Sequence, residues 1–150
     1  TAPQTAIAAG GAGLTIAKLR TAKQTFDIGD VDPSITRHIV VSPEQITNLL
    51  ATTEVTSSDF NTVKALVQGE INSFLGFNFT VSNRLSKTGN DRTCIAFAQD
   101  GLTLAIGKDI NARIDERADK SYATQVYYCQ TIGATRMEEA KVLGIVCQEA

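Results

Sequence analysis

The sequence holds a single histidine, His38, and it lies in a short apolar run with Ser42 four residues further on. A hydrolytic mechanism needs a base such as histidine beside a nucleophile such as serine. Ser42, however, directly precedes Pro43 and Glu44, a pattern typical of a helix N-terminus with serine as its cap. We therefore interpret Ser42 as a capping residue and expect no catalytic histidine–serine pair.

Candidate metal ligands do not follow a known spacing. Cys94, Cys129 and Cys147 are far apart in the sequence and have no histidine nearby, which matches no zinc motif. They lie in apolar runs, so we expect buried free thiols. A cluster of aspartates, at positions 27, 30 and 32, lacks the glycine and the closing glutamate of a calcium loop. The sequence predicts no metal site.

Glycines at positions 10, 11 and 13 precede a predicted helix and raise the question of a nucleotide site. No strand comes before them, and no Gly-Lys-Thr follows, so the phosphate loop is missing. Ile16 stands where the dinucleotide-binding pattern requires glycine. We expect no cofactor and no enzymatic activity.

Composition excludes several classes of protein. The 150 residues carry 14 Lys and Arg against 16 Asp and Glu, a net charge of −2, whereas a nucleic-acid-binding domain needs a basic excess on one face. No run of about 18 apolar residues is present, so no membrane-spanning helix is predicted. The opening residues lack the basic start of a signal peptide. We expect a globular protein of ordinary composition.

Helical and strand periodicities alternate in the first half of the chain. Apolar residues recur at helical spacing over residues 14–29, and residues 38–41 are typical of a buried strand. Residues 43–51 form a second predicted helix, with Gln45 placed to complete a capping box. A third helix is predicted over residues 58–69, followed by a strand pair over residues 70–84 that bends at Gly76.

The second half is predicted to consist mostly of strands. A polar loop is expected over residues 86–92, then two runs, 94–98 and 102–106, separated by a turn at Asp100-Gly101. Residues 110–119 alternate apolar with charged side chains, and residues 122–135 and 136–146 form two further strand-like runs. This order of helices followed by strands is typical of the α+β class.

Charges of both signs gather in this second half. Residues 113–120 include arginine, aspartate, glutamate and lysine, and a second group lies at positions 136, 138, 139 and 141. Exposed ion pairs contribute at most about 1 kcal/mol to stability, while at a subunit contact mixed charges set register and reject wrong partners. The residues alone favour a solvated surface.

Three segments resemble the major capsid proteins of tailed phages of the podovirus and prophage type, which have the Hong Kong 97-like fold. The first is SSDFNTVKALVQGEINSFLGF at residues 57–77, followed by Ser82-Asn83-Arg84-Leu85. The second is RIDERADKSYATQVY at residues 113–127 with IGATRMEEAKV at residues 132–142. A weaker third covers residues 18–23, 30–33 and 42–43. Together they span about two-thirds of the chain, in the family's own order.

The resemblance implies the C-terminal part of such a protein, with an axial and a peripheral domain. Residues 1–31 would supply a loop and helix of the peripheral domain, residues 32–109 the axial domain, and residues 110–150 peripheral strands, the last one returning to the axial sheet. Family members also have an N-terminal arm, an extended loop and a spine helix, whose contacts cannot be located in these residues. The resemblance favours a subunit interface at Arg113, Asp115, Glu116, Arg117, Arg136, Glu138 and Glu139.

The implied function is structural. Such a subunit assembles with copies of itself into pentamers and hexamers of an icosahedral head in the virion, after assembly in the host cytoplasm. Its partners would include scaffolding, portal and decoration proteins, and packaged DNA held without sequence-specific contact. The alternatives are an accessory, decoration or other binding domain of a phage particle and, third, a small enzyme.

Overall fold

The computed structural model describes residues 6–51 and 73–149 and divides into two compact units. Residues 1–102 with 137–150 form one, here called the sheet unit, and residues 103–136 form the other, here called the ribbon. Both helices and strands are present, as the α+β prediction requires. The helix predicted over residues 58–69 and the first residues of the predicted 70–84 strand pair lie outside the described residues.

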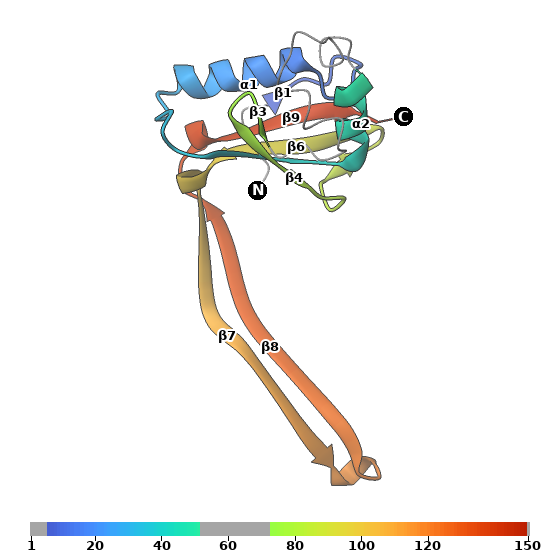
Figure 1. Ribbon diagram of the computed structural model, residues 1–150. Coiled ribbons are helices and arrows are strands. Elements are labelled where there is room, and N and C mark those ends of the chain that lie inside the picture. The colour runs from blue at the N-terminus through green and yellow to red at the C-terminus, as the bar shows by residue number, and fades with distance from the viewer. Residues whose placement is uncertain (1–5, 52–72, 150) are drawn as a thin grey trace. The chain divides into compact units, whose positions relative to one another are not determined.

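The sheet unit is built on one mixed sheet, in the order β1-β9-β6-β2-β4-β3, with β5 paired to β6 (Figure 1). Strand β6 runs antiparallel to both β2 and β9, while β2 is parallel to β4 and β1 is parallel to β9. The strands are β1 (Ala6–Ile7), β2 (Arg37–Val41), β3 (Ser73–Phe74), β4 (Phe77–Val81), β5 (Lys87–Thr88), β6 (Asp91–Ala98) and β9 (Val142–Gln148).

Two helices pack on this sheet, and both were predicted. Helix α1 (Ile16–Ile28) begins at Thr15, whose side chain accepts a hydrogen bond from the Lys18 amide. Helix α2 (Pro43–Ala51) is capped by Ser42 Oγ, which accepts from the Gln45 amide at 3.4 Å. The capping-box prediction for Gln45 was wrong. Its buried side chain instead accepts a 2.7 Å hydrogen bond from the Leu14 amide, which links the start of α1 to α2.

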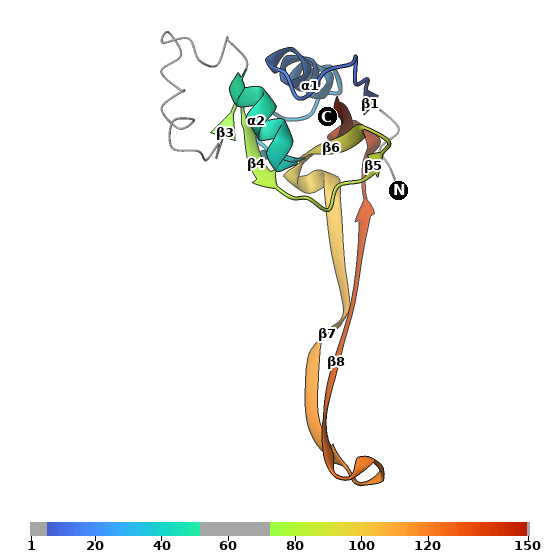
Figure 2. The same ribbon diagram turned by 90° about the vertical axis from the view of Figure 1, so that its right-hand side faces the viewer.

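The hydrophobic core lies between the helices and one face of the sheet (Figure 2). Alternate residues of each strand point into it because successive side chains of a strand face opposite sides. Burying each large side chain stabilises the fold by roughly 1.5–3 kcal/mol. The fully buried members include Leu14, Leu19, Phe26, Ile39, Leu49, Phe77, Leu143 and Ile145.

The loop and turn predictions need two corrections. The bend at Gly76 is confirmed, because β3 and β4 pair antiparallel across Leu75 and Gly76. Residues 86–92, predicted as a loop, instead contain β5 and the start of β6, which pair across a tight turn at Gly89. The runs 102–106 and 110–119 belong largely to one strand, β7 (Leu102–Arg117), because Gly107 continues the extended backbone opposite Thr131 on β8 (Ala123–Arg136).

A short turn follows β6 and another precedes β9, and these two turns contact each other. A 3-10 turn, Gln99–Gly101, follows β6, and a second, Glu139–Lys141, precedes β9. The Met137 amide donates to the Gly101 carbonyl at 3.0 Å, and Lys141 pairs with Asp100 at 2.7 Å. A side chain at Gly101 would lie 2.8 Å from Lys141 Cβ, so glycine is needed for this close approach.

A buried lysine connects the glycine-rich loop to the last strand. Lys18 is almost fully buried, and its ammonium group donates to the carbonyls of Ala12 and Gly13, at 2.7 and 2.8 Å, and of Val146 at 3.1 Å. Three acceptors match the three donors of the group, which compensates for its loss of water. The glycines at 10–13 therefore shape a structural loop.

Directly after β9, the buried carboxylate of Glu149 accepts hydrogen bonds from the start of α2, from β5 and from β6. Glu149 is 2% exposed, and its Oε1 accepts from Ser42 Oγ at 2.5 Å and from Gln45 Nε2 at 3.4 Å. Its Oε2 is 2.8 Å from Arg92 Nε and 3.2 Å from Lys87 Nζ. Burial by itself raises the pKa of Glu149, but these hydrogen bonds outweigh it and lower the pKa to about 2.

Because its pKa is lowered by folding, the Glu149 carboxylate stabilises the fold above its ordinary pKa, and this stabilisation is lost as the pH falls toward 2. We expect Glu149→Gln to lower the free energy of unfolding at pH 7 by about 3 kcal/mol, because Arg92 and Lys87 lose their buried counter-charge. Urea unfolding at pH 7 and pH 3 measures both effects.

The matched control is Glu116→Gln, which removes an exposed carboxylate from the ribbon. We expect it to change the free energy of unfolding by less than about 0.5 kcal/mol. A Glu149→Gln protein that loses as much stability as the wild type between pH 7 and pH 3 would contradict the assignment.

Candidate assembly surfaces

The residues considered for hydrolytic chemistry take structural partners. Ser42 Oγ donates a hydrogen bond to Glu149 and caps α2, so it is engaged with structural partners and not with His38. His38 stacks on Phe97, with 5.5 Å between ring centroids, on the sheet face opposite the core. The capping interpretation of Ser42 is confirmed.

The cysteines are partly as predicted. Cys94 on β6 and Cys147 on β9 are buried free thiols, and a hydrogen bond with Cys147 together with burial raises the pKa of Cys94, which stays protonated. Cys129 is partly exposed on β8, so the prediction of burial was wrong there; β8 belongs to the ribbon, where little covers its side chains. Within residues 6–51 and 73–149, no cluster of three or more His, Cys, Asp or Glu side chains could hold a metal ion.

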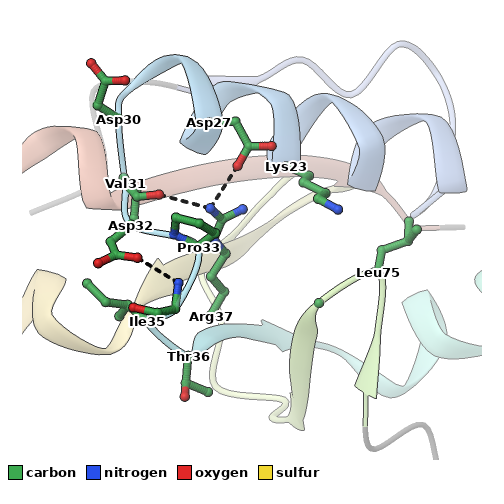
Figure 3. A pocket seen from close by; sticks show the side chains of 12 residues that line it. Lys23, Asp27, Asp30, Val31, Asp32, Pro33, Ile35, Thr36, Arg37 and Leu75 are labelled. Carbon is green, nitrogen blue, oxygen red and sulfur yellow. Dashed lines mark hydrogen bonds and ion pairs between the residues drawn. The ribbon is translucent and has the colours of Figure 1, made fainter.

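A hollow of about 630 Å³ opens at the end of α1, between Lys23 and Asp27 of the helix, the loop at 30–36 and the turn at Leu75 (Figure 3). Arg37 forms part of its wall and is 6% exposed. Its guanidinium donates to Asp27 at 2.8 Å and to the Val31 carbonyl at 3.2 Å, and lies 5.5 Å from the Phe26 ring centroid. Buried Arg37 Nε has no hydrogen-bond partner among the described residues.

The acidic residues 27, 30 and 32, compared above with a calcium loop, have separate roles. Asp27 pairs with Arg37, and Asp32 accepts a hydrogen bond from the Ser34 amide at 2.8 Å. That bond lowers the pKa of Asp32, because it favours the charged carboxylate. Asp27 thus ties the end of α1 to β2, and Asp32 stabilises the turn between them.

The ribbon consists of β7 and β8, two long antiparallel strands with distinct faces (Figure 1). A side chain at Gly107 would lie 3.5 Å from Thr131 Cγ2, so odd-numbered positions of the two strands share one face near this point. The even-numbered positions therefore share the other. That second face is mostly apolar, although it also includes Lys108, Glu116 and Gln130, and seven of its large apolar side chains are 57% to 71% exposed: Leu104, Ile106, Ile110, Ile114, Val126, Tyr128 and Ile132.

The odd face of the ribbon is polar. Asn111, Arg113 and Asp115 of β7, with Gln125 and Tyr127 of β8, line a shallow hollow of about 400 Å³, to which Lys108 also contributes. An apolar face and a polar face on one two-stranded ribbon make it amphipathic. Two strands alone are only marginally stable in water, so such a ribbon needs a neighbour over its apolar face.

The predicted interface residues fall into two groups at opposite ends of β7 and β8. Arg113, Asp115, Glu116 and Arg117 lie toward the turn between the strands, whereas Arg136, Glu138 and Glu139 lie at or beyond the far end of β8. The 14 residues of β8 span about 45 Å. The structure therefore does not bring the seven residues together, and they cannot form one small contact.

Arg117 and Glu138 of this set form ion pairs within the chain. Arg117 pairs with Asp119, and this hydrogen bond lowers the pKa of Asp119. Glu138 lies 2.9 Å from Lys141 Nζ, while the hydrogen bonds from Lys141 to Asp100 and Glu138 raise the pKa of that lysine. The sequence showed the alternation over residues 110–119, but an exposed apolar face was not inferred from it, although positions 102, 104, 106, 110, 112 and 114 are all apolar.

No described helix is both long and apolar enough to cross a membrane. No curated protein matches the sequence. Residues 1–149 match the model of a family described as phage capsid protein.

Solved structures with the same fold are similar over nearly the whole chain. A structure from Mycobacterium phage Che8 superposes with a TM-score of 0.76 at 20% identity, covering 95% of this chain and 53% of that one. The head structure of Helicobacter pylori bacteriophage KHP40 superposes with a TM-score of 0.71 at 14% identity, covering 93% of this chain and 60% of that one. The SrpI encapsulin of Synechococcus elongatus PCC 7942 superposes with a TM-score of 0.62 at 9% identity, covering 97% of this chain and 53% of that one.

The chain thus spans about half the length of these structures, and at such identities the likeness shows the fold alone. That fold is the Hong Kong 97-like fold that the sequence resemblance implied. Since the family model covers residues 1–149, the chain belongs to the phage capsid protein family.

Proposed function

We propose that this chain is the C-terminal part of a major capsid subunit, which assembles into the pentamers and hexamers of an icosahedral head enclosing DNA. The observation that carries the proposal is the family match over residues 1–149. The exposed apolar face of the ribbon supports it, because burying each of those side chains would contribute about 1.5–3 kcal/mol. A subunit of a shell is held by many such contacts at once.

In this proposal the sheet unit corresponds to the axial domain and the ribbon to the peripheral domain. The last strand, β9, then lies in the axial sheet between β6 and β1, as expected for a returning strand. Helix α1, which the resemblance assigned to the peripheral domain, packs in the sheet unit, so this proposal instead gives it to the axial domain.

Both charge groups are assigned to subunit contacts. Mixed charges at Arg113, Asp115, Glu116 and Arg117 would set the register of one contact, and Arg136, Glu138 and Glu139 would belong to another. The net charge of −2 suits a wall that contains DNA without binding it tightly. Scaffolding, portal and decoration proteins are the further partners, and the virion, assembled in the host cytoplasm, is the location.

We expect reversing the charge of Arg117 or Glu138 to reduce particle yield while leaving folding nearly unchanged. Arg117→Glu and Glu138→Lys each break one exposed ion pair, which is worth at most about 1 kcal/mol to stability. Like charges placed across a repeated contact are far more costly. Electron microscopy and sedimentation of the full-length protein measure assembly, and thermal unfolding measures folding.

Arg84→Glu is the control for this pair, because Arg84 is an exposed arginine in the sheet unit outside both charge groups. It should assemble as the wild type does. Particles of normal size and yield from Arg117→Glu and Glu138→Lys would refute the assignment of these residues to contacts.

The apolar face of the ribbon gives an independent test. Ile110→Asn places an amide on that face and should lower particle yield by about tenfold or more, since a loss of about 1.4 kcal/mol per contact is repeated around each ring. Asn111→Thr, one position along on the polar face, should assemble normally. Equal yields from the two variants would show that the apolar face stays uncovered in the shell.

A further inference from the structure

The turn between β3 and β4 has an unusual residue at its first central position. Leu75 has a φ of +52° and Gly76 a φ of +84°, so both central residues are left-handed. Such hairpin turns favour Asn-Gly or Gly-Gly, because a left-handed conformation brings the Cβ of an ordinary residue too close to the backbone. The turn geometry therefore does not explain a leucine at position 75.

The surroundings of Leu75 suggest a use for its side chain. It packs partly against the core but remains half-exposed, and it lines two hollows. One is the 630 Å³ hollow beside Arg37, where Figure 3 shows Leu75 on the side opposite Asp30 and Asp32. The other, of about 500 Å³, lies between Leu75 and the last two turns of α1. Leu75 is thus an apolar ridge between two depressions.

A second apolar side chain borders the same surface. Ile28, the last residue of α1, is 74% exposed and lines the 500 Å³ hollow. Strained backbone that presents an apolar side chain beside concave surface occurs preferentially where proteins bind partners. We propose that Leu75, Ile28 and the two hollows form a contact surface for a second copy of this chain, an inference that rests on the proposed function.

The charges around this surface favour a second copy over other partners. Arg20, Lys23 and Arg37 line the two hollows with positive charge, and Asp27, Asp30 and Asp32 with negative charge, Asp27 being paired with Arg37. A nucleic acid needs a basic excess, which these residues do not provide. An identical chain carries both signs in the same proportion, so copies can match positive to negative groups around an apolar centre.

The experiment compares folding with assembly in the full-length protein. Leu75→Asn introduces a residue that tolerates the left-handed conformation. We therefore expect the thermal unfolding midpoint of this variant to stay at or above that of the wild type. Its particle yield should fall by about tenfold or more. Ile28→Ser tests the other side of the surface and should show the same separation, because its exposed side chain contributes little to the fold.

Val81→Ser is the matched control, because Val81 is also an exposed apolar residue of the sheet unit, at 53%, and lines neither hollow. It should assemble as the wild type does. Wild-type yields from both Leu75→Asn and Ile28→Ser would overturn the inference while leaving the proposed function intact. A steep drop in the unfolding midpoint of Leu75→Asn would also overturn it, by making Leu75 a core residue. A wild-type protein that never assembles would overturn both.

Discussion

The sheet unit depends on a buried carboxylate that joins parts of the chain far apart in sequence. Glu149 at the end of β9 accepts hydrogen bonds from Ser42 and Gln45 of α2, and it pairs with Arg92 of β6 and Lys87 of β5. A buried charge is tolerated when hydrogen bonds and opposite charges replace the water it loses, and here they do so well enough to lower its pKa.

The buried positive charge of Lys18 is compensated in the same way as the buried carboxylate. Lys18 is buried because three carbonyls replace its water, one of them from β9. Together, Lys18 and Glu149 hold the last strand to α1, α2 and β6.

The ribbon follows the opposite logic. Its strands bury almost nothing within the described chain, and one face presents large apolar side chains to solvent. A protein that worked alone would gain stability by making this face polar. Retaining it makes sense in a particle, where neighbouring protein covers each subunit, and where mixed-sign charges can reject misplaced neighbours.

Local signals determined much of this protein from sequence alone. Helical spacing and the Ser42-Pro43 cap located α1 and α2, and the glycine at position 76 located the β3–β4 bend. These predictions succeeded because caps, turns and periodicity act over a few residues. The quoted motifs also placed the chain in its family, and the match of the family model to residues 1–149 confirms this.

Only the tertiary structure determined which residues, distant in sequence, contact each other. Gln45 has the spacing of a capping box, yet it bonds to Leu14, a residue 31 positions away that comes near it only in the folded structure. The predicted runs 102–106 and 110–119 left Gly107 outside any strand, yet it lies within one long strand, since pairing with β8 outweighs its weak preference for strands. The charged residues at 113–117 and 136–139 looked like one surface and lie at opposite ends of β7 and β8, because a strand extends about 3.3 Å per residue.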